Sequence, residues 1–510
     1  MSLDTALSIA RSGLAATQRQ LALASQNVAN ATTAGYTRKT LTLTSQDVNG
    51  LALGVRTGEA TRTVDQALIN ERNNRNAASE AYTVRDKLLA GVEAVYGQPT
   101  DGNTLGNAIN AIQSAFTKLR DAPSDTGIQR EALTAANNAV TLFHEAGQAI
   151  LGAREQAQTG IETEVQAVND SLRTIAGLTD QIRNLTASGI STADLEDKRD
   201  QAIAKLSESL PVQTVKQSDG GVVLLGRNGV NLNLPTHGED ILSVDHAEVG
   251  ADSYYGATGT LPGVTMGGVD ITGQLSGGRL TENIVMRDQV LPRMMAEVDV
   301  AASELASRLD AVGLTLFTDA SGTVPDPSAG YVAGNELGFS LSIQVNTAVS
   351  SDLTKLRDGT HNVTGSATGP SAFTTNPAGG PTGFTTLIDR VLNNALGSEA
   401  QTGVAWASFP STGLGPDGTL SSSLTASRTL TDYAAQVSSS HANTRAEAVA
   451  AQTSAAALRD ALTARIDAKS SVDSDTEMSN LVKLQNAYAA NARVMTTVQS
   501  MYDALMAAVR

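Results

Sequence analysis

The sequence predicts a multidomain α+β protein: an elongated helical frame built from both chain ends, with coiled-coil-like termini and a long-helix bundle, and with two β-containing insertions. Three observations support this prediction. Both ends of the 510-residue chain show heptad repeats of apolar residues. Long segments between them follow the 3.6-residue period of amphipathic helices. Two middle stretches instead combine Gly, Pro and Asn-Gly signals with β-branched residues.

The N-terminal segment, residues 1–45, is predicted to begin with a helix that packs against other helices. Apolar residues recur every seven positions, and small residues occupy the second seam between them. An ordinary amphipathic surface helix remains the alternative, because periodicity alone does not distinguish the two. The seam residues are Leu3, Leu7, Leu14, Leu21 and Val28.

The C-terminal segment, residues 470–510, repeats this pattern. Ser474 to Glu477 fits a capping box that would start its helix. The simplest explanation of two heptad helices at opposite ends of one chain is that they pair, within the molecule or in an assembly. Alone such helices are marginal, so we expect the first 45 and last 40 residues or so to be disordered until assembly. The two seams of this segment contain Leu481, Tyr488, Met495 and Tyr502, and Leu484, Asn491, Val498 and Leu505.

The interior of the chain divides into three further parts by its residue composition and periodicity. Residues 46–210, 276–320 and 430–469 are predicted to form a helical bundle. Residues 211–275, with turns at Asp219-Gly220-Gly221 and Asn228-Gly229, are predicted to form a small β domain. Residues 321–429 are predicted to be a second, outer β-rich insertion with a strand over 339–345. One apolar stripe predicts a long buried helix: Leu291, Met295, Val298, Ala302, Leu305, Leu309, Val312 and Leu316.

The composition restricts the function. The formal net charge is −16 without a basic stripe, which disfavours nucleic-acid binding because phosphate neutralisation needs clustered Lys and Arg. The chain has no cysteine, and its five His residues form no metal-binding pair. Phosphate-binding loops and nucleophile elbows are also missing. We therefore expect no enzyme activity, no cofactor and no metal, and we expect Trp406, the one tryptophan, to anchor a small core.

Membrane insertion is not expected either, because no stretch reaches the length of a membrane span. The N-terminus also lacks the basic start, uninterrupted apolar run and cleavage site of a signal peptide. Any export of this chain would therefore need a route that does not read a cleaved signal.

Two terminal motifs resemble a known family. SQNVANATTAGYTRK, residues 25–39, resembles the N-terminal signature of the bacterial flagellar axial proteins, which are rod, hook and hook-associated proteins. In that motif a helix with Asn27 and Asn30 runs into a turn at Gly35 and Tyr36. Residues 477–506 resemble the matching C-terminal signature. Residues 116–147 and 271–313 resemble internal segments of the hook-associated proteins at the junction of hook and filament.

This resemblance implies a structural subunit of the bacterial flagellum that forms the junction layer between hook and filament. It implies polymerisation through the N- and C-terminal helices, with the hook subunit and the next junction protein as neighbours. It also implies an extracellular location, export through the flagellar type III apparatus, and a cytosolic export chaperone at the C-terminal helices.

Three alternatives remain. A hook subunit shares the terminal motifs but is expected to lack the 271–313 segment. An enzyme carried in the insertions would need convergent carboxylates, and a surface adhesin would use the outer insertion.

Overall fold

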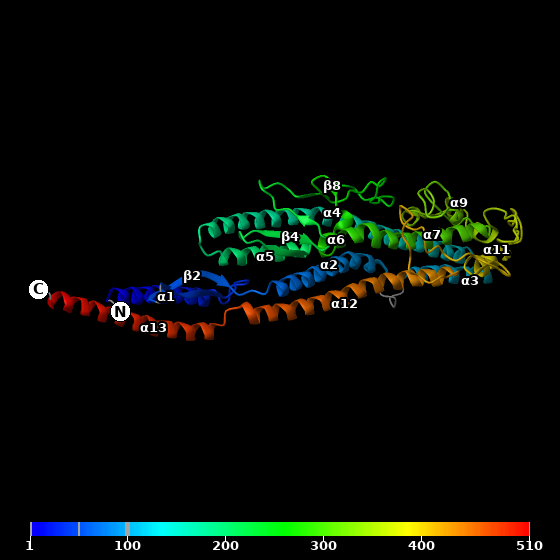
Figure 1. The fold of residues 1–510 in the computed structure, drawn as a ribbon. Helices are drawn as coiled ribbons and strands as arrows, with labels where there is room; N and C mark the ends of the chain where they lie inside the picture. The colour runs from blue at the N-terminus through cyan, green and yellow to red at the C-terminus, as the bar shows by residue number, and fades with distance from the viewer. Residues whose placement is uncertain (1–2, 49–50, 97–102, 509–510) are drawn as a thin grey trace.

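The computed structural model describes residues 3–48, 51–96 and 103–508 of the chain. The molecule is elongated, and both chain ends lie at the same end of it, where α1 (Leu3–Ala29) and α13 (Ser474–Ala508) run side by side (Figure 1). The middle of the sequence, drawn yellow-green, lies at the opposite end. The predicted fold class, a helical frame built from both chain ends with smaller β elements, is confirmed.

Long helices form the body of the molecule. Among them are α2 (Gln66–Tyr96), α3 (Leu105–Asp121), α4 (Thr126–Ala187) and α12 (Leu430–Ser470). The longest, α4, has 62 residues, so at 1.5 Å per residue it is about 90 Å long. It begins after Asp125, whose side chain accepts hydrogen bonds from the backbone N–H groups of Gly127 and Ile128.

The helices α2 and α12 pair in opposite directions. Lys469, at the end of α12, lies 2.9 Å from the carboxylate of Asp65, just before α2 begins. Arg445, one third of the way along α12, lies 2.8 Å from Asp86 and also pairs with Glu93, both in the second half of α2. Segments from the two ends of the sequence are therefore joined along the body as well as at the termini.

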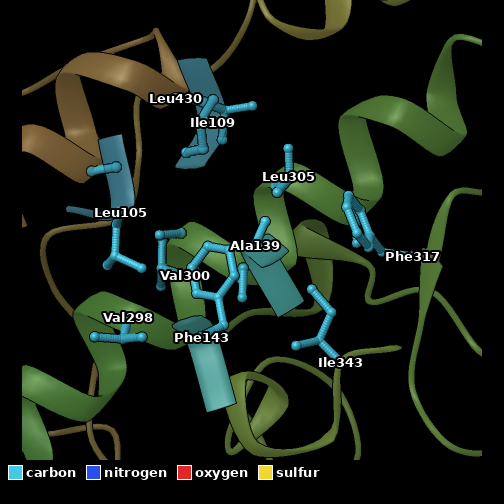
Figure 2. Packing of buried hydrophobic residues seen from close by; sticks show 14 of the residues in the cluster. Leu105, Ile109, Ala139, Phe143, Val298, Val300, Leu305, Phe317, Ile343 and Leu430 are labelled. Atoms are coloured by element: carbon cyan, nitrogen blue, oxygen red, sulfur yellow. The ribbon is translucent and has the colours of Figure 1, made fainter. Parts of the chain in front are cut away.

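The larger core lies at the end of the molecule far from the termini. Here α6 (Gly278–Val285) continues through a π-helical turn (Met286–Val290) into α7 (Leu291–Ala311). Figure 2 shows Ala139 and Phe143 of α4 beside Val300 of α7. The predicted apolar stripe is confirmed, although its last two residues lie beyond the helix. Each of its members is at most 1% exposed: Leu291, Met295, Val298, Ala302, Leu305, Leu309, Val312 and Leu316.

Residues 211–275 form two small antiparallel sheets, with strand orders β3-β4-β5 and β6-β7-β8. They follow α5 (Ala193–Ser209), and the predicted turns between β3 and β4 and between β4 and β5 are confirmed. Val168 and Leu172 of α4 share a core with Leu224 of β4, so these sheets pack on helices. The strands are β3 (Val212–Lys216), β4 (Val222–Gly226), β5 (Asn231–Leu232), β6 (Leu242–Ser243), β7 (Thr265–Met266) and β8 (Val269–Asp270).

Residues 321–429 are not β-rich, which contradicts the prediction. The predicted strand over 339–345 is wrong for residues 339–342 and confirmed only for its last two residues. Phe339 and Ile343 are buried in the larger core, and their four-residue spacing belongs to a helical turn. The helical turns are η3 (Pro327–Ala329), α8 (Phe339–Ser342), α9 (Thr347–Ser351), α10 (Lys355–Asp358), α11 (Thr386–Arg390) and η4 (Val391–Ala395). The strands are β10 (Gln344–Val345), which pairs with β9 (Phe317–Thr318), and the pair β11 (Glu399–Gln401) and β12 (Val404–Ala405).

A long β-hairpin follows α1 and was not predicted. It consists of β1 (Lys39–Val48) and β2 (Leu51–Arg62), which pair antiparallel with two register shifts. The hairpin packs against α1, where the hydroxyl of Ser12 accepts a hydrogen bond of 3.1 Å from the backbone N–H of Val55. Residues 46–62, assigned to the helical bundle from the sequence, therefore belong structurally with the N-terminal helix.

Candidate assembly site

The two terminal helices run antiparallel and contact each other along their length. Three polar contacts fix their register. The hydroxyl of Tyr502 donates a hydrogen bond to Asp4, the side-chain amide of Asn491 donates to the hydroxyl of Thr17 at 3.4 Å, and that of Gln18 donates to the hydroxyl of Tyr488 at 3.4 Å. Small residues on α1, among them Ala10, Ala16 and Ala24, are buried and allow the close approach.

The structure places most of the predicted seam residues on partly or fully covered faces of this pair. Val498 is buried, whereas Leu505 is 52% exposed and lies outside the covered face. The remaining predicted residues are half-buried: Leu3, Leu7, Leu14, Leu21 and Val28 on α1, and Leu481, Leu484, Tyr488, Asn491, Met495 and Tyr502 on α13. The outermost residues of the predicted terminal segments, 1–2 and 509–510, lie outside the described part of the chain.

Within the described residues both terminal segments are helical, and each provides an apolar partner for the other. That they are disordered before assembly stays a prediction. The predicted capping box at Ser474 is wrong. Asp473 caps α13 instead, accepting hydrogen bonds from the backbone N–H groups of Asp475 and Thr476 and from the hydroxyl of Thr476. Glu477 is thereby free to pair with Arg38 at 2.7 Å.

The pair of α1 and α13 leaves several apolar residues of α13 uncovered. They are between 50% and 64% exposed, which is unusual for a helix that already packs against a neighbour. Val494, Met501 and Leu505 are separated by seven and four residues, so they form one strip beside the buried Val498, which we call the uncovered face of α13. The exposed apolar residues of α13 are Met478, Val482, Val494, Met501, Leu505 and Met506.

Asn27 closes the turn at the end of α1. It is 1% exposed, and its side chain accepts hydrogen bonds from the hydroxyl of Tyr36 at 3.0 Å and from the backbone N–H of Lys39 at 3.2 Å. Its amide group donates to the backbone carbonyl of Lys39 at 2.9 Å. Asn30 acts more locally, donating to the carbonyl of Gln26 and accepting from the hydroxyl of Thr33. The two asparagines of the motif thus shape the return of the chain from helix to strand.

Gly35 and Tyr36 occupy the tightest part of this turn. Gly35 has φ +74°, and a Cβ atom there would lie 2.2 Å from the side-chain nitrogen of Gln201 in α5. The ring of Tyr36 covers Lys39, whose ammonium lies 3.3 Å from the ring centroid. Burial raises the pKa of the Tyr36 hydroxyl. The turn therefore favours glycine because of its positive φ, whereas the flexible side chain of Gln201 is able to move aside.

A buried ionic cluster joins this turn and the hairpin to α5. The carboxylate of Asp197 lies 3.1 Å from the ammonium of Lys39 and 2.9 Å from the guanidinium of Arg62, and all three side chains are at most 5% exposed. Asp197 also accepts hydrogen bonds from the backbone N–H and hydroxyl of Thr37 at 3.1 and 2.7 Å. We call Thr37, Lys39, Arg62 and Asp197 the joint.

Neighbouring carboxylates balance the charge of the joint. Burial lowers the pKa of Lys39, but hydrogen bonds to Asp194 and Asp197 outweigh it and leave that pKa raised. Burial likewise lowers the pKa of Arg62, while Asp200 and Glu196 raise it to a higher net value. These groups stay ionised, so the joint is held by charge-assisted bonds in a dry environment.

A further link connects the turn to the other end of the chain. The backbone N–H of Arg38 donates a 2.7 Å hydrogen bond to the carbonyl of Ser470, the last residue of α12. The pairing of Arg38 with Glu477 reaches the first turn of α13. Both terminal helices, the hairpin, α5 and α12 therefore meet at one place.

Sequence reasoning did not find the joint. Lys39 and Arg62 lie 158 and 135 residues from Asp197, and no local spacing relates either of them to it. The hairpin could have been found, because Asn49-Gly50 stands between two stretches rich in Thr, Leu and Val and is a strong hairpin signal.

The described residues hold no enzyme-like or metal-like arrangement that competes with assembly. No group of three or more His, Asp or Glu side chains among them could hold a metal ion. Glu297 contacts the buried His441 at 2.8 Å and the half-buried Ser422 at 2.6 Å. The carboxylate stands between the other two, so the histidine does not contact the serine as it does in a Ser-His-Asp triad. Within the described ranges no helix is long and apolar enough to cross a membrane.

Three family models match the chain, one at each end and one in the middle. "Flagella basal body rod protein" matches residues 7–37, in α1 and the turn that Asn27 closes. "Flagellar hook-associated protein FlgK helical domain" matches residues 89–322, which include α3 to α7. "Flagellar basal body rod FlgEFG protein C-terminal" matches residues 467–508, which include α13.

Relatives named flagellar hook-associated protein 1 are similar over part of the chain. That of Bacillus subtilis (strain 168) is 23% identical over 364 residues, covering 64% of this chain and 72% of the relative. Those of Salmonella typhimurium and Escherichia coli (strain K12) are both 27% identical and cover 44% of this chain. The matches span 41% and 42% of those relatives.

A solved structure, the flagellar hook junction protein FlgK from Burkholderia pseudomallei, aligns with 24% identity and a TM-score of 0.39 over 50% of this chain and 45% of that one. The matches therefore agree on the flagellar axial proteins: the chain is similar to flagellar hook-associated protein 1 over its helical middle and to basal body rod proteins at both ends.

Proposed function

We propose that the chain is a structural subunit of the junction between hook and filament in a bacterial flagellum, and that it polymerises through α1 and α13. The observation that carries this proposal is the uncovered apolar face of α13. Burying apolar surface stabilises an assembly by about 25 cal/mol per Å², and within one subunit this face has nothing against it. Copies of the terminal pair in neighbouring subunits would cover it.

The family match favours this function over a hook subunit, because the helical domain of hook-associated proteins matches residues 89–322 and includes the predicted 271–313 segment. The relatives are named for a place in the flagellum, which disfavours an enzyme. In the proposed assembly, residues 1–45 and 470–510 form the inner tube, and the bundle with the 211–275 and 321–429 segments lies outside it.

The proposal includes the assembly partners of the subunit and its route of export from the cell. The subunit contacts copies of itself, the hook subunit on one side and the next junction protein on the other. It reaches the cell exterior through the flagellar type III apparatus without a cleaved signal peptide, and a cytosolic chaperone covers its C-terminal helices before export. The uncovered apolar face of α13 gives such a chaperone a reason to bind.

The test is Met501→Asp, which places a charge on the uncovered face at a side chain that is 53% exposed within one subunit. Complementation of a deletion strain, followed by electron microscopy of isolated hooks, should show hooks without filaments. The matched control is Val269→Asp, since Val269 is 63% exposed on β8 in the outer part. Filaments at wild-type frequency with Met501→Asp, in a protein that is exported normally, would disprove the role of this face.

A further inference from the structure

A cavity beside Trp406 is not explained by assembly. It has a volume of about 470 Å³, within the range of small-ligand pockets, and lies between the last turns of α7 and two loops of the 321–429 segment. Its lining includes Trp406, Arg308, Glu304, Asp310, Pro325 and Asp326. It lies in the distal body, away from the terminal helices that the proposed function uses.

Trp406 is only half-buried here, contrary to its predicted role as a core anchor. Its indole N–H donates a 2.9 Å hydrogen bond to the backbone carbonyl of Asn394, which holds the ring in one orientation. An aromatic ring that is fixed by its polar edge and exposed beside a cavity offers a flat apolar surface to a ligand.

Arg308 brings an unused hydrogen-bond donor to the same cavity. The residue is 1% exposed, and its guanidinium carbon lies 5.1 Å from the ring centroid of Trp406 and 4.7 Å from that of Phe409. Nε donates to Glu304 at 2.8 Å and Nη1 to the carbonyl of Arg428 at 2.7 Å. Within the described part of the chain Nη2 forms no hydrogen bond, and it is not one of the fully enclosed polar atoms that lack a partner. This nitrogen is therefore able to donate to a ligand in the cavity.

Three carboxylates add acceptors around this donor. Asp310 uses one oxygen for the hydroxyl of Thr315, and Asp326 uses one to cap its own turn at Ser328, so each has a second oxygen available. Glu304 pairs with Arg308 through one oxygen. An anionic ligand would be repelled, because three carboxylates outnumber one guanidinium that already pairs with Glu304. A neutral ligand with several hydroxyls is not repelled and can also use the ring of Trp406, whereas a cation is the alternative that the titration below tests.

We propose that this cavity binds a neutral sugar ring. The apolar C–H face of a sugar stacks on a ring such as that of Trp406. A sugar hydroxyl can donate one hydrogen bond and accept others, so neighbouring hydroxyls bond to Asp310 and to Arg308 at once. The cavity accommodates one or two sugar residues, which makes an extracellular polysaccharide or glycan chain the class of ligand.

Trp406 provides a direct test, because the chain has no other tryptophan. The full-length protein is titrated with glucose, galactose, mannose and N-acetylglucosamine while tryptophan emission is recorded. At least one of these sugars should give a saturable change, and glucuronate and galacturonate should bind more weakly than glucose and galactose. If none of the four neutral sugars changes the emission, or if arginine amide alone does so, the sugar assignment is wrong.

Two variants locate the binding. Asp310→Asn and Asp326→Asn should each weaken the best sugar about tenfold, as expected for the loss of one charged hydrogen bond. Asp417→Asn, at an exposed carboxylate that bonds only to its own turn at Thr419, is the matched control and should bind normally. Circular dichroism checks that each variant is folded. Unchanged affinity in both folded cavity variants would overturn the proposal, whereas filament assembly, tested separately, depends on α13.

Discussion

At the scale of single residues, Asn27 shows how one side chain decides the path of the chain. Its amide satisfies both backbone groups of Lys39 and the hydroxyl of Tyr36 in a buried place. An aspartate would lose the donor, and an alanine would leave all three partners unsatisfied. The terminal motif therefore reflects hydrogen bonding that no other side chain of this size provides.

We predict that Asn27→Ala destabilises the terminal unit by about 2 kcal/mol or more, because a buried polar group left without a partner costs about 1–3 kcal/mol. Hydrogen–deuterium exchange of residues 3–62 measures this directly. Asn30→Ala is the control, because Asn30 bonds only within its own turn, and it should change exchange by less than about 0.5 kcal/mol. Equal effects of the two substitutions would contradict the role given to Asn27.

A second prediction for a single residue concerns Glu336 and the dependence of protein stability on pH. Burial raises the pKa of this carboxyl to about 7, a hydrogen bond from Ser303 opposes the shift, and the charges of Glu304, Asp299 and Asp326 add to it. The folded state therefore keeps its proton at pH values where the unfolded chain has lost it. By linkage, stability falls as the pH rises from about 4.5 to about 7 and changes no further above that range.

Glu336→Gln removes this titration and should stabilise the protein at pH 8 relative to the wild type, by an amount on the order of a few kcal/mol, while having little effect near pH 4.5. Urea unfolding of both proteins at several pH values gives the difference. A difference that does not depend on pH would mean that Glu336 stays ionised in the folded protein.

At the scale of elements, the joint connects the terminal unit, made of α1 and the hairpin, to the helical body. These two parts otherwise share little surface. The hairpin and α1 contact the body mainly where Lys39 and Arg62 reach Asp197 of α5. Asp197 alone bonds to Lys39, Arg62 and Thr37 at once. Its removal costs less than the ~3–5 kcal/mol of an uncompensated buried charge, because Lys39 keeps Asp194 and Arg62 keeps Glu196 and Asp200. The joint therefore fixes how the terminal pair is held on the body.

We predict that Asp197→Asn releases the terminal unit while the body stays folded. Limited proteolysis should cut between residues 30 and 64 much faster than in the wild type and leave a stable fragment that contains α4 and α7. Asp194→Asn is a matched control, since its side chain is 57% exposed and its pairing with Lys39 is open to solvent. Similar cleavage rates in the wild type and Asp197→Asn would argue against the joint.

The sequence predicted those elements whose signal is local. Heptads and 3.6-residue stripes identified α1, α7 and α13, because one face of each is apolar along its whole length. The 339–345 segment was predicted as a strand because apolar and polar residues alternate in it. The same residues also fit a helical turn with Phe339 and Ile343 on one side. The joint was not predictable, because its charged residues look like an ordinary solvated helix face until the fold brings them together.

At the scale of the whole molecule, the larger core shows that the 321–429 segment is not a separate appendage. Phe339, Leu387 and Val391 of this segment are buried in one cluster with Phe143 of α4 and Leu305 of α7. Figure 2 shows the same cluster with Leu430, the first residue of α12. The sequence predicted an outer insertion, because residues 321–429 are rich in loop-forming residues. Their few apolar residues nevertheless contribute to the larger core.

We predict that this segment and the helical bundle unfold as one cooperative unit. Phe339→Ala, at a residue 2% exposed, should lower the free energy of unfolding by about 3–5 kcal/mol, as for other large-to-small changes in cores. Trp406 fluorescence reports the segment and far-UV circular dichroism reports mainly the helices, so both urea transitions should shift together. Val332→Ala, at a residue 49% exposed in the same segment, should shift neither. If only the fluorescence transition moves in Phe339→Ala, the segment folds independently, and its deletion would leave the helical body intact.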